Sequence, residues 1–414
     1  LSGVGKACPK HLLTGTSHFM TQKNTHVKPA LGLPEFIALM ALMTSLVALS
    51  IDAMLPALDA IGTAMGAKDI HESHLIVSLF FGGMAVGQLF FGPYCDTRGR
   101  REAIILGLVI FAVGTVVCML ADDMQTMLIG RVIQAFGVSG PRIASTAVIR
   151  DQFAGEAMAR VMSFIMMVFI LVPMLAPMVG QWVLNIASWF HIFTLFLLVA
   201  VFTGTWFWIR QPETLPASRR KPFSWAQFFR SSLFIVTHKP VIGPTLAMGC
   251  VFGGFLAYLS ASQTIFQGFY GVGEMFSYIF ATLAFSIGLA SFINSKIVMR
   301  LGMYRVTQVA LIGSVVFAII FLGIIEMFDG LPPLVVTIGS LFIGFFFVGL
   351  LFGNLNAMAM HPLGDMAGLG AAIIGSLSSI IAVLVATTVD SYLTVDLFPI
   401  GAGFLVFFTL AFII

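Results

Sequence analysis

Long apolar runs alternate with short polar connectors along almost the whole chain. A membrane hydrocarbon core about 30 Å thick needs about 20 apolar residues per helical span. Runs of that length predict helices at residues 36–58, 75–94, 103–121, 124–148, 161–184, 187–209, 241–265, 275–298, 304–326, 332–358, 367–389 and 397–414. We therefore expect an all-α integral membrane protein with about twelve transmembrane helices, and an even count places both ends on one side.

A polar connector divides the predicted spans into six and six, as in transporters built from internal repeats. The expected parts are a tail (1–33), an N-terminal six-helix bundle (34–210), a linker (211–240) and a C-terminal six-helix bundle (241–414). Basic residues beside aromatics in the linker fit either an interfacial helix or a solvated connection.

Composition changes this picture little but excludes a water-soluble domain. Charged residues make up 9% of the chain and hydrophobic residues 59%, with a mean hydropathy of +1.02, whereas soluble proteins carry about a quarter charged residues. The polar tail has no apolar core, so it is not a cleavable signal peptide. Met20 is a candidate for the natural start.

The basic residues predict the orientation. Those on the side of the N-terminus are Arg98, Arg100, Arg101, Arg150, Arg160, Arg219, Arg220, Lys221, Arg230, Lys239, Lys296, Arg300 and Arg305. The opposite connectors hold Lys68 and the acids Asp69, Glu72, Asp122, Asp123, Glu274, Asp329 and Asp396. Basic connectors stay in the cytoplasm, so we expect a multi-pass protein of the bacterial inner membrane with a cytoplasmic N-terminus. The net charge of +3 reflects this topology, and no nucleic-acid partner is expected.

The sequence lacks the residue patterns that an enzyme, an ATP-driven pump or a channel would need. An enzyme needs a convergent set of nucleophile, base or metal ligands, and His71, His74 and His191 are assigned to connectors. No GxxxxGK[ST] loop is present for ATP, and no polar rings suggest a channel. The cysteines have no metal or redox spacing: Cys8, Cys95, Cys118 and Cys250. We expect no catalytic residue, metal or cofactor.

Ionisable residues inside spans are candidates for function because their burial is costly. Asp52 lies roughly 24 Å along the first span, and Arg131 about 10 Å into the fourth span from the other side, so the two could share a depth. A carboxylate beside an arginine can change its proton affinity with conformation, as a proton-coupled carrier requires. The alternatives are a static ion pair or a solvated aspartate.

Arg142 follows Arg131 by 11 residues, about three helical turns, so both should share one helix face with Gln134. If that face lines a cavity, two arginines about 16 Å apart would suit an extended anion with two carboxylates. Alternatively, Arg142 reaches the cytoplasmic surface.

The connector after the second span contains a sequence motif. Its residues are Gly92, Asp96, Gly99, Arg100 and Arg101. They resemble the cytoplasmic loop motif of the major facilitator superfamily, with a departure at Thr97 and Arg98. The segments 50–58, 131–134, 149–153 and 211–215 are similar to the Bcr/CflA-type drug:proton antiporters.

Two further spans carry the resemblance. Pro173, Pro177 and Gly180 in the fifth span resemble the antiporter motif of exporters, whose prolines kink the helix. The seventh span contributes the segment 258–262, and Tyr258 and Gln263 complete the candidates for substrate binding.

The resemblance implies a secondary exporter that works by alternating access, with Asp52 as protonation site and Arg131 as its partner. We expect the protein to be a monomer. It implies that loop 92–101 stabilises the outward-open state. The group includes exporters of drugs and of metabolites. Arg142 is not a family feature, and it favours an anionic metabolite such as a carboxylate siderophore. The alternatives are a multidrug exporter of lipophilic antibiotics and, more distantly, an integral-membrane enzyme.

Overall fold

The computed structural model describes residues 31–153, 155–220 and 224–414, and regular structure in these ranges is helical. The predicted tail, up to residue 30, lies outside the described residues, as does Lys221. The linker contains a helix, α8 (Trp225–Thr237), at the position where the sequence allows an interfacial helix.

The remaining helices follow the predicted spans. The first half contains α1 (Leu33–Asp52), α2 (Leu58–Ala64), α3 (Ile70–Arg98), α4 (Arg100–Met119), α5 (Met124–Gln152), α6 (Gly155–Ile186) and α7 (Phe190–Arg210). The second half contains α9 (Lys239–Gln263), α10 (Phe276–Leu301), α11 (Met303–Met327), α12 (Leu334–Met360), α13 (Ala367–Asp390) and α14 (Phe398–Ile413). In the described part of the chain, 10 helices are long and apolar enough to cross a membrane, and shorter apolar runs lie in α6 and α14. The predicted all-α membrane architecture is confirmed.

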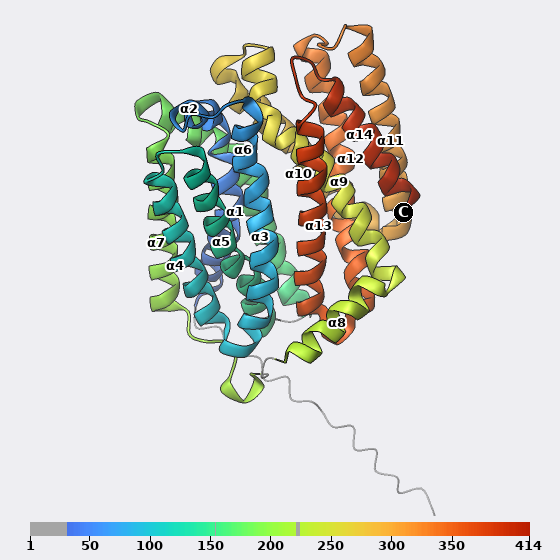
Figure 1. Ribbon diagram of the computed structural model, residues 1–414. Helices are drawn as coiled ribbons and strands as arrows, with labels where there is room; N and C mark the ends of the chain where they lie inside the picture. Colours follow the sequence, from blue (N-terminus) through green and yellow to red (C-terminus); the bar gives the residue numbers. More distant parts are fainter. Residues whose placement is uncertain (1–30, 154, 221–223) are drawn as a thin grey trace, which may run out of the picture.

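The helices form two groups that stand side by side (Figure 1). In the first group α5 packs on α3 and α4, and in the second α9 packs on α12, α13 and α14. The two groups meet mainly where α3 packs on α13 and where α6 packs on α10. The exact limits of the two bundles, 34–210 and 241–414, stay a prediction.

Small residues allow the first group to pack closely. A Cβ on Gly83 of α3 would lie 2.6 Å from the Val132 carbonyl oxygen of α5, and one on Gly107 of α4 would lie 2.6 Å from the Gly137 carbonyl oxygen. Glycines at such contacts are typical of membrane helices, because close backbone approach supplies the van der Waals attraction. This packing makes α3, α4 and α5 a tight frame for the side chains they carry.

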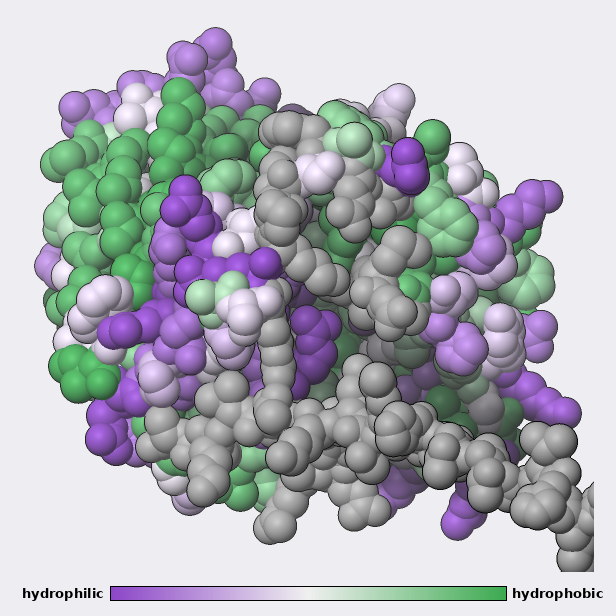
Figure 2. Space-filling model, turned by 90° about the horizontal axis from the view of Figure 1, so that it is seen from below, coloured by the Kyte–Doolittle hydropathy of each residue, from purple (hydrophilic) through white to green (hydrophobic). Residues whose placement is uncertain are grey.

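The two ends of the helix bundle differ in charge. We call the end where α3 finishes at Arg98 and α10 finishes near Arg300 the basic end, and the other, where Asp69 and Asp123 begin α3 and α5, the acidic end. The backbone N–H and the hydroxyl of Thr126 both donate to Asp123, which lowers the pKa of its carboxyl. Hydrophilic residues gather on the face of the basic end, and hydrophobic residues cover the flank beside it (Figure 2).

Candidate functional site: a cavity between the two halves

The site begins at a break in the first span. Helix α1 ends at Asp52, and the chain continues through a short 3-10 turn, Leu55–Ala57, before α2. Pro56 has no N–H to continue the ladder of helical hydrogen bonds. The break turns the Ala53 carbonyl oxygen towards α6, where Gly180 packs directly against it. Asp52 is thus held in the last turn of α1, where it is 6% exposed.

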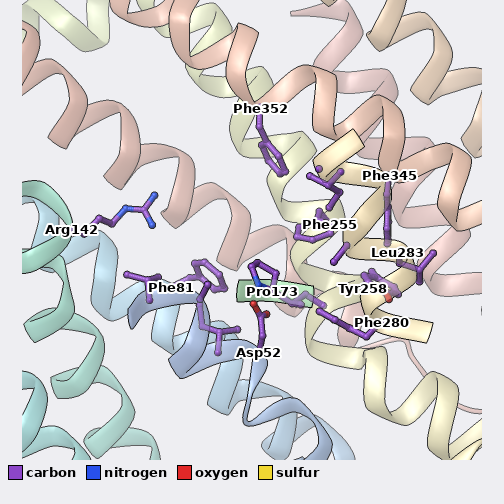
Figure 3. Close-up of a pocket in the computed structure, with 17 residues that line it drawn as sticks. Asp52, Phe81, Arg142, Pro173, Phe255, Tyr258, Phe280, Leu283, Phe345 and Phe352 are labelled. Carbon is purple, nitrogen blue, oxygen red and sulfur yellow. The ribbon is translucent and has the colours of Figure 1, made fainter. Parts of the chain in front are cut away.

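Asp52 lines a cavity of about 240 Å³ between the two halves. The polar side chains in its wall are Asp52, Arg142 and Tyr258. The phenylalanines in its wall are Phe81, Phe255, Phe280, Phe345 and Phe352. Figure 3 shows Asp52 beside Pro173, with Arg142 on one side of the view and Tyr258, Leu283 and Phe345 on the other. An apolar wall with a few polar groups is typical of small-molecule sites.

Asp52 faces this cavity without a cationic partner. The ion pairs among the described residues do not include it. The predicted pairing of Asp52 with Arg131 is therefore not formed in this structure.

Arg131 is fully buried beside the first span rather than in the cavity wall. Its guanidinium donates to Gln134 Oε1 at 2.5 Å, to the Ser50 carbonyl oxygen at 3.2 Å and to the Ile76 carbonyl oxygen at 3.3 Å. It also lies 4.2 Å from the ring centre of Phe80. Helices α1 and α3 cover this part of α5. Arg131 therefore ties α1, α3 and α5 together in this structure.

Gln134 and Gln263, two other predicted substrate-binding residues, also lie away from the cavity wall. The Gln134 side chain is buried between Arg131 and Thr115, to whose hydroxyl it donates at 2.8 Å. Gln263 Nε2 donates to the Pro56 carbonyl oxygen at 3.1 Å, and its Oε1 accepts from the Asp59 N–H at 3.1 Å. Gln263 therefore joins the two halves at the acidic end.

Arg142 and Tyr258, two further candidates for substrate binding, lie in the cavity wall. Arg142 lies ten residues before the end of α5, roughly 15 Å along the helix, and its exposed side chain faces the cavity. The Tyr258 hydroxyl is buried and has no hydrogen-bond partner, while its ring packs edge-on against Phe345, with centres 4.6 Å apart. An unpaired buried hydroxyl is a group that a bound molecule could satisfy.

The cavity is closed at the acidic end. Besides Gln263, Ser277 of α10 donates to the Pro177 carbonyl oxygen of α6 at 3.1 Å. Midway along the bundle, Ser376 of α13 donates to the Ala85 carbonyl oxygen of α3 at 2.6 Å. These hydrogen bonds between the two halves lie at the acidic end or midway along the bundle.

The loop motif at the basic end forms a network with the first half and with the start of the linker. Gly99 adopts a positive φ of 120°, which favours glycine, and the following N–H groups of Arg100 and Arg101 both donate to the Glu213 carboxylate at 3.0 Å. The Arg100 guanidinium pairs with Asp96 at 3.0 Å and with Asp151 at 2.9 Å. The roles of Asp151 and Glu213 were missed, although both lie in segments that carry the family resemblance.

Two other motif residues make packing contacts. A Cβ on Gly92 would lie 3.0 Å from Ala372 Cβ, so this glycine lets α3 approach α13 of the second half. Arg101 lies over the Trp208 ring at 4.1 Å.

The three predicted residues of α6 have different surroundings. Pro173 lines the cavity, Pro177 accepts the hydrogen bond from Ser277, and Gly180 packs against Ala53. The segment thus connects the cavity wall, the break after Asp52 and the contact between the halves.

A helical membrane protein whose two halves enclose a small-molecule cavity has the architecture of a secondary transporter. The family model described as Major Facilitator Superfamily matches residues 39–386, and the chain belongs to this family. It is therefore a transporter and not an enzyme.

Individual relatives agree with this assignment. The chain is 28% identical to a bicyclomycin resistance protein homolog of Haemophilus influenzae over 86% of this chain and 89% of that protein. It is 28% identical to the uncharacterized MFS-type transporter YdgK of Bacillus subtilis over 88% of this chain and 90% of that protein. Among solved structures, the xylose transporter XylE of E. coli, in a partially occluded inward-open conformation, matches with a TM-score of 0.72 and 13% identity over 92% and 96% of the two chains.

Proposed function

We propose that the protein is a proton-coupled exporter of a small, largely apolar organic molecule. The cavity carries this proposal, because five phenylalanines and Tyr258 surround one carboxylate and one guanidinium among the wall residues that the structure describes. Aromatic and apolar walls gain free energy by removing apolar surface from water. The relative named as a bicyclomycin resistance protein homolog supports a substrate of the lipophilic antibiotic class.

The carboxylate siderophore favoured by the sequence is not carried forward. That prediction rested on two arginines in the cavity wall, and only Arg142 lies there. A single guanidinium can bind one acidic or strongly polar group of a mainly apolar substrate, and the Tyr258 hydroxyl offers a second polar contact.

Asp52 is the proposed proton site. It borders the cavity without a cationic partner, so a cationic or polar substrate and a proton would compete for the same carboxylate. We further propose that the basic end faces the cytoplasm of a bacterial inner membrane. The closed acidic end then corresponds to an inward-facing state. A monomeric assembly remains part of the proposal.

The test is efflux from proteoliposomes with an imposed pH gradient, using lipophilic antibiotics that are cationic, neutral or anionic. Asp52→Asn should fold and bind but lose the acceleration by the gradient, because the amide cannot titrate. Asp59→Asn, seven residues further at the acidic end, is the matched control and should keep it. Gradient-driven efflux at the wild-type rate from Asp52→Asn would overturn the coupling role.

The same assay tests the class of substrate. Arg142→Lys should weaken transport of anionic compounds, since a lysine cannot bind a carboxylate bidentately, and should spare neutral ones. Transport restricted to hydrophilic polycarboxylates would contradict the proposal of a largely apolar substrate. An anionic metabolite would then be the favoured substrate.

A further inference from the structure

A cluster of His71, His74 and Asp390 joins the two halves at the acidic end. The two histidines lie three residues apart on α3, so they share a helix face, and Asp390 is the last residue of α13. His74 Nδ1 is hydrogen-bonded to Asp390 Oδ1, and His71 Nδ1 lies 3.3 Å from Asp390 Oδ2. The sequence analysis assigned both histidines to a connector, whereas they lie in α3. It could not suggest the cluster, because Asp390 lies more than 300 residues further along the chain.

We propose that these three side chains bind a transition-metal ion of the zinc class from the acidic end, and that the bound ion locks this end closed. Each residue offers one ligand atom, and the three atoms lie within 4.8 Å of one another. Two imidazole nitrogens with one carboxylate oxygen are donors that zinc accepts, with a fourth position left for water.

The dimensions fit such an ion after a small movement. Zinc bonds of about 2.0–2.1 Å in a tetrahedron place neighbouring ligands about 3.3 Å apart. This is the separation found between His71 Nδ1 and Asp390 Oδ2. The three ligand atoms lie within 4.8 Å of one another, so reaching the tetrahedral spacing requires shifts of about 1.5 Å at most. His71, whose side chain is 34% exposed, has room to turn.

The surroundings also suit a metal site. His74 Nε2 lies 2.9 Å from the Thr264 hydroxyl of the second half, and a metal-binding histidine ordinarily donates its other N–H to such a partner. The partly exposed His71 provides the entry path, while His74 and Asp390 are buried.

The ion would act as a lock because its ligands come from both halves. Opening the acidic end separates the start of α3 from the end of α13, so only the closed state keeps all three ligands together. An ion that binds only one state shifts the equilibrium between the two states towards that state. At an ion concentration 100 times the dissociation constant, the equilibrium constant changes by about 100-fold. External zinc should therefore slow transport.

The first experiment measures zinc binding to the purified full chain in detergent, by competition with a chromophoric chelator. We expect one zinc ion per chain at this site. His71→Ala should weaken binding at least about tenfold while leaving the hydrogen bond between His74 and Asp390 in place. His191→Ala, which removes an exposed histidine outside the cluster, is the matched control and should bind as the wild type does.

The second experiment adds zinc to the side of the acidic end during transport in proteoliposomes. Zinc should inhibit the wild type and His191→Ala, but not His71→Ala at the same concentration. No saturable binding, or equal binding by His71→Ala, would overturn the metal site. Binding without inhibition would overturn its role as a lock. The binding measurement needs no substrate, so it stands or fails independently of the proposed export function.

Discussion

Gly180→Ala tests the close contact of α6 with the break in the first span. A Cβ at position 180 would collide with the Ala53 carbonyl oxygen, and a backbone atom cannot rotate away as a flexible side chain could. Overpacking of this kind costs about 1–3 kcal/mol. The substitution also gains about 1 kcal/mol from the higher helix propensity of alanine, so the net change is a loss of about 0–2 kcal/mol.

Gly339→Ala in α12 separates the two contributions. A Cβ at position 339 meets no atom within 4 Å, so this variant should show the gain in helix propensity without strain. The difference between the two variants is then the strain alone, about 1–3 kcal/mol. Thermal unfolding in detergent, followed by tryptophan fluorescence, should give a lower Tm for Gly180→Ala than for Gly339→Ala.

The contact also bears on transport, because Ala53 directly follows Asp52. Strain at Ala53 should displace the last turn of α1 and lower the turnover of Gly180→Ala, while Gly339→Ala should transport as the wild type does. Equal Tm values and equal turnover for the two alanine variants would refute the reasoning. The glycine would then be needed for neither packing nor site geometry.

Two further predictions concern buried polar contacts. Glu213→Ala removes the acceptor of the first N–H groups of α4 and should cost about 0.5–2 kcal/mol, as the loss of a helix N-cap does; a Tm unchanged from the wild type would contradict this. Arg131→Lys should leave some of the acceptors on Gln134, Ser50 and Ile76 unpaired, which costs about 1–3 kcal/mol and should lower the Tm. Loss of proton coupling at an unchanged Tm would instead restore Arg131 as the partner of Asp52.

The sequence predicts the helices well because a membrane span leaves a long apolar run. It also gives Asp52 as a candidate, since an acid in such a run is costly, and the structure places this residue in the cavity wall. Helical spacing correctly places Arg131 and Arg142 along α5, but it cannot say which neighbouring helices cover each side chain. Helices α1 and α3 cover Arg131 and leave Arg142 facing the cavity.

The features that the sequence does not predict depend on contacts between distant segments. The Glu213 carboxylate accepts hydrogen bonds from N–H groups more than 110 residues earlier in the chain, and Gln263 contacts residues more than 200 positions away. Neither residue shows a local pattern that identifies its partner. The histidines of α3 likewise become a cluster only when α13 brings Asp390 beside them.

The position of the contacts between the halves suggests what alternation requires. At the acidic end the two halves are joined by hydrogen bonds, each of which contributes about 0.5–1.5 kcal/mol net. Water can replace these bonds when that end opens. The loop at the basic end is bonded within the first half and to Glu213 at the start of the linker, so closing that end need not break its network. Helix α3 contacts α13 both midway, where Ser376 donates to Ala85, and near the basic end, where Gly92 approaches Ala372. We expect the halves to rock about the midway contact of this pair, so that α3 and α13 separate at the acidic end as they approach at the basic end. The hydrogen bonds exchanged amount to a few kcal/mol, a free-energy difference small enough for both states to be populated.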